Sequence, residues 1–135
     1  MRIVVDTNVF FSSFYGGHSR KVIDLWKTGE VTICLSGPIL DEYLEVLDRA
    51  FEGEPERDEI AALFTGGYQS VFTAKPAGLK IADLDPDDVK FIECAVSLQA
   101  EWIVTGDRGL LRMRQYGRTS ITSPAEFLRS IRKKS

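Results

Sequence analysis

Residues 3–8 read Ile-Val-Val-Asp-Thr-Asn, a short apolar run that ends at the acid Asp6. Consecutive β-branched residues are typical of a strand. Ligands in open α/β sheets bind outside the carboxyl ends of the strands, so an acid in this position is a candidate site residue. The alternative is that Asp6 caps the segment that follows it, as Asp often does. This stretch predicts a first strand and places Asp6 where a site is expected.

The rest of the chain alternates strand-like and helix-like segments. Further β-prone runs, bounded by turn formers or polar residues, lie at residues 31–35, 71–73, 102–105 and 119–122. Helical periodicity is found at about residues 19–28, 37–51, 56–69 and 86–99 and from about residue 124. Such alternation predicts an α/β fold of three layers (α/β/α), with a central, mostly parallel five-stranded sheet between helices.

Length and composition restrict the kind of protein. With 135 residues, of which 44% are hydrophobic, the chain has the size and composition of one globular domain, residues 1–135. No apolar stretch approaches the roughly 18 residues needed to span a bilayer, and the run before Asp6 is far shorter than a signal-peptide core. We therefore expect no membrane association and a cytoplasmic location.

Cysteine and histidine are not expected to carry the chemistry. Cys34 and Cys94 lie in apolar segments without a CxxC pair or a His at ligand spacing, which predicts buried, reduced thiols. His18 is the single histidine, lies where a loop is expected, and has no partners for a catalytic triad.

One acid of the helical segment 37–51 differs from its neighbours. Glu42 flanks the apolar stripe of this segment, whereas Asp41, Glu45 and Asp48 fall on the opposite side. This position lets Glu42 reach toward the sheet edge. A border residue of an exposed face would look the same, and this alternative stays open.

Asp88 lies in the segment Asp-Pro-Asp-Asp-Val-Lys-Phe at residues 85–91. Acids in a first helical turn suit the helix dipole, so capping is one interpretation. Asp88, however, shares a helix face with Ile92 inside a wide apolar arc. Because an unpaired buried carboxylate is unfavourable, a metal ion or a tight set of hydrogen bonds is implied. Asp87 lies at the edge of the arc and is the second choice.

A fourth acid, Asp107, follows the strand-like run at 102–105 in a glycine-flanked turn. A right-handed βαβ topology brings the chain segments that carry these four acids to one edge of the sheet. Clustered carboxylates repel one another and a polyanionic substrate, and such oxygen ligands fit Mg²⁺ or Mn²⁺ rather than zinc. The chemistry then expected is metal-assisted hydrolysis of phosphodiester bonds.

Basic residues dominate after Asp107, although the net charge of the chain is −3. A basic segment can hold phosphates, and a solvated basic surface is the alternative. Arg108, Arg112 and Arg114 are therefore candidates to steer a nucleic-acid backbone. Lys90 is a further candidate for a phosphate contact.

Four ordered motifs resemble the PIN-domain family and together cover nearly the whole chain. They are Val-Asp-Thr-Asn at residues 5–8, Leu-Asp-Glu-Tyr at 40–43, the segment at 85–91 and Val-Thr-Gly-Asp at 104–107. They look most like a toxin subgroup whose relatives act in type II toxin-antitoxin systems. The resemblance implies a PIN fold, Mg²⁺ or Mn²⁺ as cofactor, cleavage of single-stranded RNA, an antitoxin protein as partner, and a homodimer.

Carried over by motif, the resemblance implies a catalytic and metal-binding quartet of Asp6, Glu42, Asp88 and Asp107. Asp6 and Asp88 would be the principal metal ligands, and Glu42 would position or deprotonate the attacking water. Asp107 would serve a second, weaker metal site or act through water. Asn8 and Thr105 are expected to orient metal-bound water, although they could equally be turn and strand residues.

Other classes of protein with an acid after the first strand fit less well. A phosphoaspartyl-transfer enzyme expects a second Asp two residues further on, where this chain has Asn8. A receiver domain expects an Asp after its third strand, which residues 72–75 lack. The remaining alternative is a non-catalytic PIN-like module that binds RNA or protein, and the presence of all four acids disfavours it.

Aromatic residues gather near the N-terminus at Phe10, Phe11, Phe14, Tyr15 and Trp26. Such residues most often signal a core. Some of them could instead form a homodimer or antitoxin surface, and the sequence leaves this open.

Overall fold

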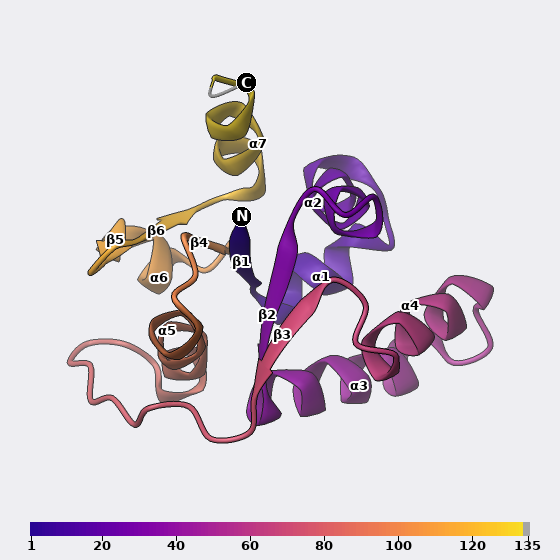
Figure 1. Ribbon diagram of the computed structural model, residues 1–135, viewed down its shortest axis with the longest axis horizontal. Coiled ribbons are helices and arrows are strands. Elements are labelled where there is room, and N and C mark those ends of the chain that lie inside the picture. Colours follow the sequence, from indigo (N-terminus) through magenta and orange to yellow (C-terminus); the bar gives the residue numbers. More distant parts are fainter. Residues whose placement is uncertain (134–135) are drawn as a thin grey trace.

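The computed structural model describes residues 1–133, and its centre is a six-stranded sheet of order β3-β2-β1-β4-β6-β5 (Figure 1). In chain order the strands are β1 (Arg2–Val5), β2 (Thr32–Ser36), β3 (Ser70–Thr73), β4 (Trp102–Val104), β5 (Gln115–Tyr116) and β6 (Thr119–Thr122). Neighbouring strands are parallel except β5 and β6, which are antiparallel. The predicted mostly parallel sheet is confirmed, with one strand more than expected.

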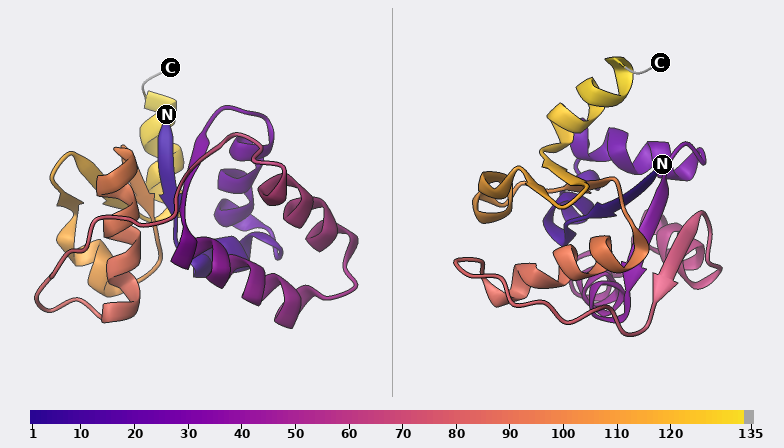
Figure 2. Two further views of the ribbon diagram at one scale, coloured as in Figure 1. Left: turned by 60° about the horizontal axis from the view of Figure 1, so that its bottom comes forward. Right: turned by 60° about the vertical axis from the view of Figure 1, so that its left-hand side comes forward.

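Helices cover the sheet from both sides. They are α1 (Thr7–Ser13), α2 (Gly17–Lys27), α3 (Gly37–Phe51), α4 (Pro55–Thr65), α5 (Pro86–Leu98), α6 (Arg108–Met113) and α7 (Pro124–Lys133). Figure 2 shows α5 on one side of the sheet and α1 and α2 on the other. The three-layer α/β/α fold predicted from the alternation of segments is therefore confirmed. No helix within residues 1–133 is long and apolar enough to cross a membrane.

The sequence also explains where the two helices that carry candidate acids begin. The Ser36 side chain accepts a hydrogen bond from the Ile39 N–H and caps α3. Asp85 caps α5 in the same way, accepting from the Asp87 N–H, and Pro86 fills the first helical position, where no backbone N–H is needed. These two caps fix where α3 and α5 begin. Asp88 lies in the first turn of α5, and Glu42 lies in the second turn of α3.

The structure corrects the prediction at its shortest elements. α1, α6 and β5 have seven, six and two residues, and segments of this length carry too little periodicity to be detected. β5 is the strand that the sequence did not predict. The chain turns from β5 into β6 through Gly117, whose φ is 57°, and the two strands pair antiparallel. The helix expected over residues 56–69 ends at Thr65, because two glycines follow and Gly67 has a φ of 70°. His18 lies in the first turn of α2 instead of in a loop.

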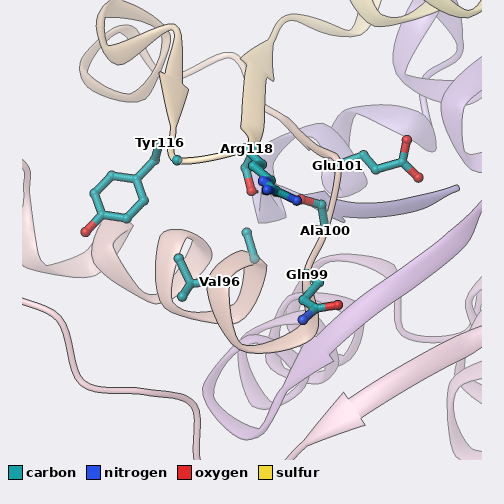
Figure 3. A pocket seen from close by; sticks show the side chains of 9 residues that line it. Val96, Gln99, Ala100, Glu101, Tyr116 and Arg118 are labelled. Carbon is teal, nitrogen blue, oxygen red and sulfur yellow. Dashed lines mark hydrogen bonds between the residues drawn. The ribbon is translucent and has the colours of Figure 1, made fainter.

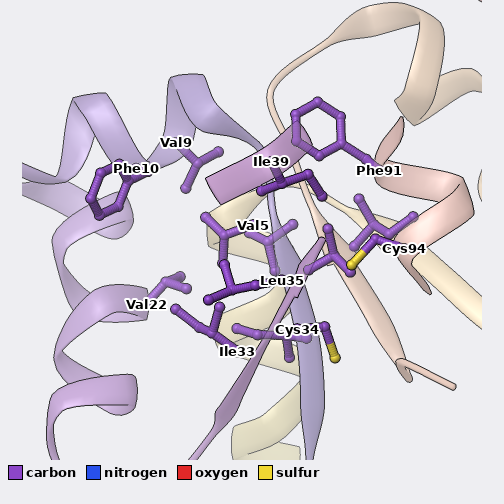
Figure 4. Close-up of a cluster of buried hydrophobic side chains, with 14 of the residues drawn as sticks. Val5, Val9, Phe10, Val22, Ile33, Cys34, Leu35, Ile39, Phe91 and Cys94 are labelled. Carbon is purple, nitrogen blue, oxygen red and sulfur yellow. The ribbon is translucent and has the colours of Figure 1, made fainter. Parts of the chain in front are cut away.

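The core lies on both faces of the sheet, as the close-up of buried side chains shows (Figure 4). Phe10 and Trp26 are fully buried, which confirms the core assignment for these two aromatic residues. Tyr15 is 73% exposed and does not belong to the core. Cys34 and Cys94 are buried free thiols, as predicted.

Candidate functional site

Asp6 occupies the carboxyl end of β1, between the sheet and α1. Its backbone N–H donates to the carbonyl of Val104 on β4 at 2.9 Å, so the ends of the two strands lie side by side. One carboxylate oxygen accepts from the Asn8 N–H at 3.0 Å and thereby caps α1. The residue is only 4% exposed, yet its carboxylate borders a cavity. Asp6 therefore caps α1, as the alternative interpretation expected, and also lines the candidate site.

Thr105 links the acids that follow β1 and β4. Its hydroxyl donates to Asp6 Oδ2 at 2.7 Å and accepts from the Asp107 N–H at 3.0 Å, and the residue is completely buried. Asp107 in turn caps α6, because its Oδ2 accepts from the Leu110 N–H at 2.9 Å. The hydroxyl proton of Thr105 is committed to Asp6, so in this structure Thr105 orients a carboxylate.

Glu42 reaches the same edge from α3 and is held by two side chains. Thr7 donates its hydroxyl to Glu42 Oε1, and the Lys90 ammonium lies 2.8 Å from Glu42 Oε2. Thr7 is 5% exposed and was not identified from the sequence, where only its position between Asp6 and Asn8 could have suggested it. The helical-wheel placement of Glu42 at the border of the apolar stripe agrees with its partly buried position beside the sheet.

Among the described residues, Asp88 is the acid of the four whose carboxylate accepts no hydrogen bond. Within residues 1–133, no hydrogen-bond donor contacts its carboxylate, although the side chain is partly buried. Burial and, to a smaller extent, the negative charges of Asp107, Asp6 and Asp85 raise the pKa of Asp88 to about 6, although the positive charge of Lys90 opposes them. An ordinary hydrogen-bonded cap would have the opposite effect. Asp88 is therefore held next to other carboxylates without a compensating contact.

Electrostatic coupling shows that the four acids gather at one edge of the sheet. Burial raises the pKa of Asp6, the hydrogen bonds from Thr105 and Asn8 partly lower it, and the charges of Asp107 and Glu42 raise it again. Asp88 is coupled to Asp107 and Asp6 as well. Right-handed parallel connections thus bring Asp6, Glu42, Asp88 and Asp107 together from β1, α3, α5 and the end of β4.

A cavity of about 350 Å³ opens at this edge. Three of the acids, Asp6, Glu42 and Asp88, line it together with Asn8 and Lys90. Its remaining lining residues are Thr7, Glu45, Val46, Arg49, Asp87 and Phe91. Glu45 and Arg49 were not expected there, because their exposure on the helical wheel gave no signal. Asp107 and Thr105 do not line the cavity. Thr105 affects it by hydrogen bonding to Asp6, and the charge of Asp107 raises the pKa values of Asp6 and Asp88.

A larger cavity, of about 650 Å³, lies at the other end of the sheet (Figure 3). It is bordered by Ala100 and Glu101, which precede β4, and by Tyr116, Arg118 and Thr119 around the β5–β6 turn. These positions are at the amino ends of β4 and β6, and none of the four acids lines the cavity. The candidate site is therefore the smaller, acidic cavity at the carboxyl ends of the strands.

The donor set of the acidic cavity suits a hard divalent cation. No three Asp, Glu, His or Cys side chains within residues 1–133 converge closely enough to enclose an ion. Mg²⁺ does not need such a cage, since it keeps several waters and is usually bound through one or two carboxylates plus substrate phosphates. The unpartnered carboxylate of Asp88 beside Asp6, both with raised pKa values, is the kind of group that a cation would compensate.

The arginines proposed as contacts for a nucleic-acid backbone lie outside the acidic cavity. Arg108 and Arg112 are exposed on α6, and Arg114 is exposed at the C-terminal end of that helix. Arg112 borders a separate small cavity beside residues 81–84. Of the four basic candidates, only Lys90 lines the cavity that contains the acids.

Replacing Asp88 by Asn should stabilise the metal-free protein at pH 7. The pKa of Asp88 is raised from 3.8 to about 6, so the folded state binds this proton more tightly than the unfolded state, and stability is lost as the pH rises through that interval. Allowing for solvent screening, Asp88→Asn should raise the free energy of unfolding by about 1–2 kcal/mol. The measurement is urea unfolding in EDTA at several pH values, and the gain should shrink as the pH approaches 4.

Asp87→Asn is the matched control for this change. It removes the same charge from the exposed neighbour in the same helical turn and should alter stability by less than about 0.5 kcal/mol. Equal stability of wild type and Asp88→Asn at pH 7 would contradict the raised pKa.

Replacing Thr105 by Val should weaken both stability and metal binding. The change removes the donor to Asp6 and the acceptor for the Asp107 N–H while it keeps the shape of the side chain. We expect a loss of about 1–3 kcal/mol in unfolding free energy and roughly tenfold weaker Mn²⁺ binding.

Thr122→Val provides the matched comparison on the adjacent strand. The Thr122 hydroxyl oxygen is buried without a hydrogen-bond partner, so this change should be neutral or stabilising. Urea unfolding and calorimetric Mn²⁺ titration measure both variants. If the two changes had equal effects, the Thr105 hydroxyl would not be supporting Asp6.

The fold and site define an α/β protein with a cluster of acids at the carboxyl ends of a parallel sheet. The sequence model of the PIN domain matches residues 2–109, and the chain therefore belongs to the PIN-domain family, whose members are generally nucleases. A solved structure with the same fold is that of VapBC2 from Rickettsia felis bound to a DNA fragment from its promoter. The TM-score is 0.57 at 15% sequence identity, over 90% of this chain and 97% of that chain. No curated protein sequence matches this chain.

Proposed function

We propose that this protein is a divalent-metal-dependent endoribonuclease that hydrolyses phosphodiester bonds of single-stranded RNA. The observation that carries the proposal is the juxtaposition of Asp6, Glu42, Asp88 and Asp107, in which the Asp88 carboxylate has no hydrogen-bond donor among the described residues. Such an arrangement lowers the stability of the folded protein, and uncompensated charges of this kind concentrate at functional sites.

Asp6 and Asp88 would hold Mg²⁺ or Mn²⁺, and Asp107 would contribute a second, weaker position or act through water. A bound divalent cation would supply charge neutralisation and activation of water for attack on phosphorus. Thr105 and the Asn8 N–H keep the Asp6 carboxylate in a fixed orientation, which matters because ligand misplacement weakens metal sites.

Glu42 would position or deprotonate the attacking water from its place beside Asp6. Asn8 lines the cavity with an exposed side chain and would help to orient that water. Arg108, Arg112 and Arg114, which lie outside the cavity, would steer a longer RNA strand toward it through its phosphates.

The biological role we propose is that of a toxin in a type II toxin-antitoxin pair. The support is the PIN-domain membership together with the shared fold of VapBC2 from Rickettsia felis. An antitoxin protein, a homodimer and a cytoplasmic location belong to the same proposal. Co-purification of this chain with the product of an adjacent gene, and loss of its toxicity when both are expressed, would support the pairing.

Cleavage of single-stranded RNA by the purified protein tests the proposed reaction. Cleavage should require Mg²⁺ or Mn²⁺, stop in EDTA and return when the metal is restored. Metal-independent cleavage would contradict the proposed mechanism. RNA or protein binding without cleavage, under conditions where metal binds, would instead favour a non-catalytic PIN-like module.

A further inference from the structure

Lys90 is the cation built into the acidic cavity. Its side chain is only 15% exposed, and its ammonium lies 2.8 Å from Glu42 Oε2. The same nitrogen donates to the carbonyl oxygen of Asp87 at 2.5 Å and lies 5.0 Å from the centre of the Phe91 ring. Arg49, the other cation that lines the cavity, is exposed and lies 3.4 Å from Glu45. Lys90 is thus fixed by several contacts at once.

The contact with Lys90 makes the environment of Glu42 different from that of Asp88. Both carboxylate oxygens of Glu42 have protein partners, since Thr7 donates to Oε1 and Lys90 pairs with Oε2. Asp88, two residues before Lys90 on α5, has no hydrogen-bond donor among the described residues. A carboxylate that is already neutralised by an ammonium gains less from a divalent cation than one that is not.

We propose that Lys90 is a positioning residue that holds Glu42 as a protein-bound carboxylate and keeps it from becoming a direct ligand of a cation bound at Asp6 and Asp88. This inference rests on the proposed function, since it concerns the same site. Lys90 sets which acids face the metal, and Glu42 stays at the border of the site beside Thr7. The ion pair also neutralises one of the four acids when no metal is bound.

A double-mutant cycle on metal binding tests this role without RNA. Mn²⁺ is titrated calorimetrically into the metal-free wild type, Lys90→Met, Glu42→Gln and the double variant, at one pH and ionic strength. Lys90→Met should bind Mn²⁺ at least about fivefold more tightly than wild type, because it frees the negative charge of Glu42 to ligate the cation. In the Glu42→Gln background the same change should alter the affinity by less than about twofold, because no carboxylate is released.

Two further variants separate this role from a general charge effect. Lys90→Arg keeps the positive charge and the ion pair and should bind Mn²⁺ within about twofold of wild type. Lys21→Met removes a positive charge from the exposed face of α2 and should also leave the affinity within about twofold. Urea unfolding confirms that each variant is folded before titration.

The outcomes distinguish this inference from the proposed function. An equal gain from Lys90→Met in both backgrounds would mean that Lys90 only repels the metal, and this overturns the positioning role. Unchanged or weaker binding in Lys90→Met overturns it as well. Absence of Mn²⁺ binding in the wild type and every variant overturns this role and the metal-dependent function together.

Discussion

Replacing Asp6 by Asn should lower the rate of metal-dependent RNA cleavage at least about 100-fold while the protein remains folded. The amide has the shape of the carboxylate and can still accept from the Asn8 N–H, so the cap of α1 is retained. It lacks the negative charge that makes a carboxylate a much stronger ligand of a divalent cation than a neutral amide. The measurement is the initial rate of cleavage of a labelled single-stranded RNA at saturating Mn²⁺, with calorimetric titration of the metal.

The matched control for Asp6→Asn is Asp41→Asn. Asp41 is exposed on α3 next to Glu42 and does not line the acidic cavity. Its replacement makes the same change in net charge and should keep the cleavage rate within about twofold of wild type. Full activity of Asp6→Asn, with normal Mn²⁺ binding, would show that Asp6 is not a metal ligand.

Replacing Tyr43 by Ala should give the largest loss of stability among the changes considered, about 3–5 kcal/mol of unfolding free energy. Tyr43 is completely buried on α3, and its ring stacks on Phe10 with centroids 4.7 Å apart and packs against Phe64. Its hydroxyl donates to the carbonyl oxygen of Val5, the residue directly before Asp6. The truncation would therefore leave a cavity beneath the acidic edge, and urea unfolding followed by circular dichroism measures the loss.

Tyr43→Phe separates the contribution of the hydroxyl from that of the ring. It keeps the stacking and removes only the donor to Val5, so it should cost about 1–2 kcal/mol. Burial raises the pKa of Tyr43 well above its ordinary value, which keeps the phenol neutral and able to donate at any pH used for the assay. A loss as large for Phe as for Ala would show that ring packing is not the main contribution of Tyr43.

The fold was predictable from the sequence because its main elements are long or sharply bounded. The helix over residues 37–51 and the strands near residues 3–5 and 102–105 have clear periodicity or β-branched runs, and the structure confirms them. Short elements were missed for the opposite reason, as α1, α6 and β5 show. Their conformations are set by caps and by pairing with β6, which only the folded chain supplies.

The candidate site was predictable to the extent that each acid left a local signal. Asp6 directly follows an apolar run, which placed it at the carboxyl end of a strand. Asp88 shares a helix face with Ile92, which implied a buried carboxylate. The distinction between Asp88 and Asp87 agrees with the structure, in which Asp87 is exposed and Asp88 partly buried. Thr7 gave no such signal, because a hydroxyl between two polar residues is common in turns.

The sequence by itself determined the order of the longer strands and helices, the position of the acids at strand and helix ends, and the membership of the PIN-domain family. These features depend on periodicity, caps and short motifs, which are local properties of the chain. Only the tertiary structure decided which groups each acid meets: Thr105 on Asp6, Lys90 and Thr7 on Glu42, and no donor among the described residues on Asp88. The hydrogen bonds of Thr7 with Glu42 and of Thr105 with Asp6 join residues that are 35 and 99 positions apart in the sequence. Only the packing of the folded chain brings such residues together.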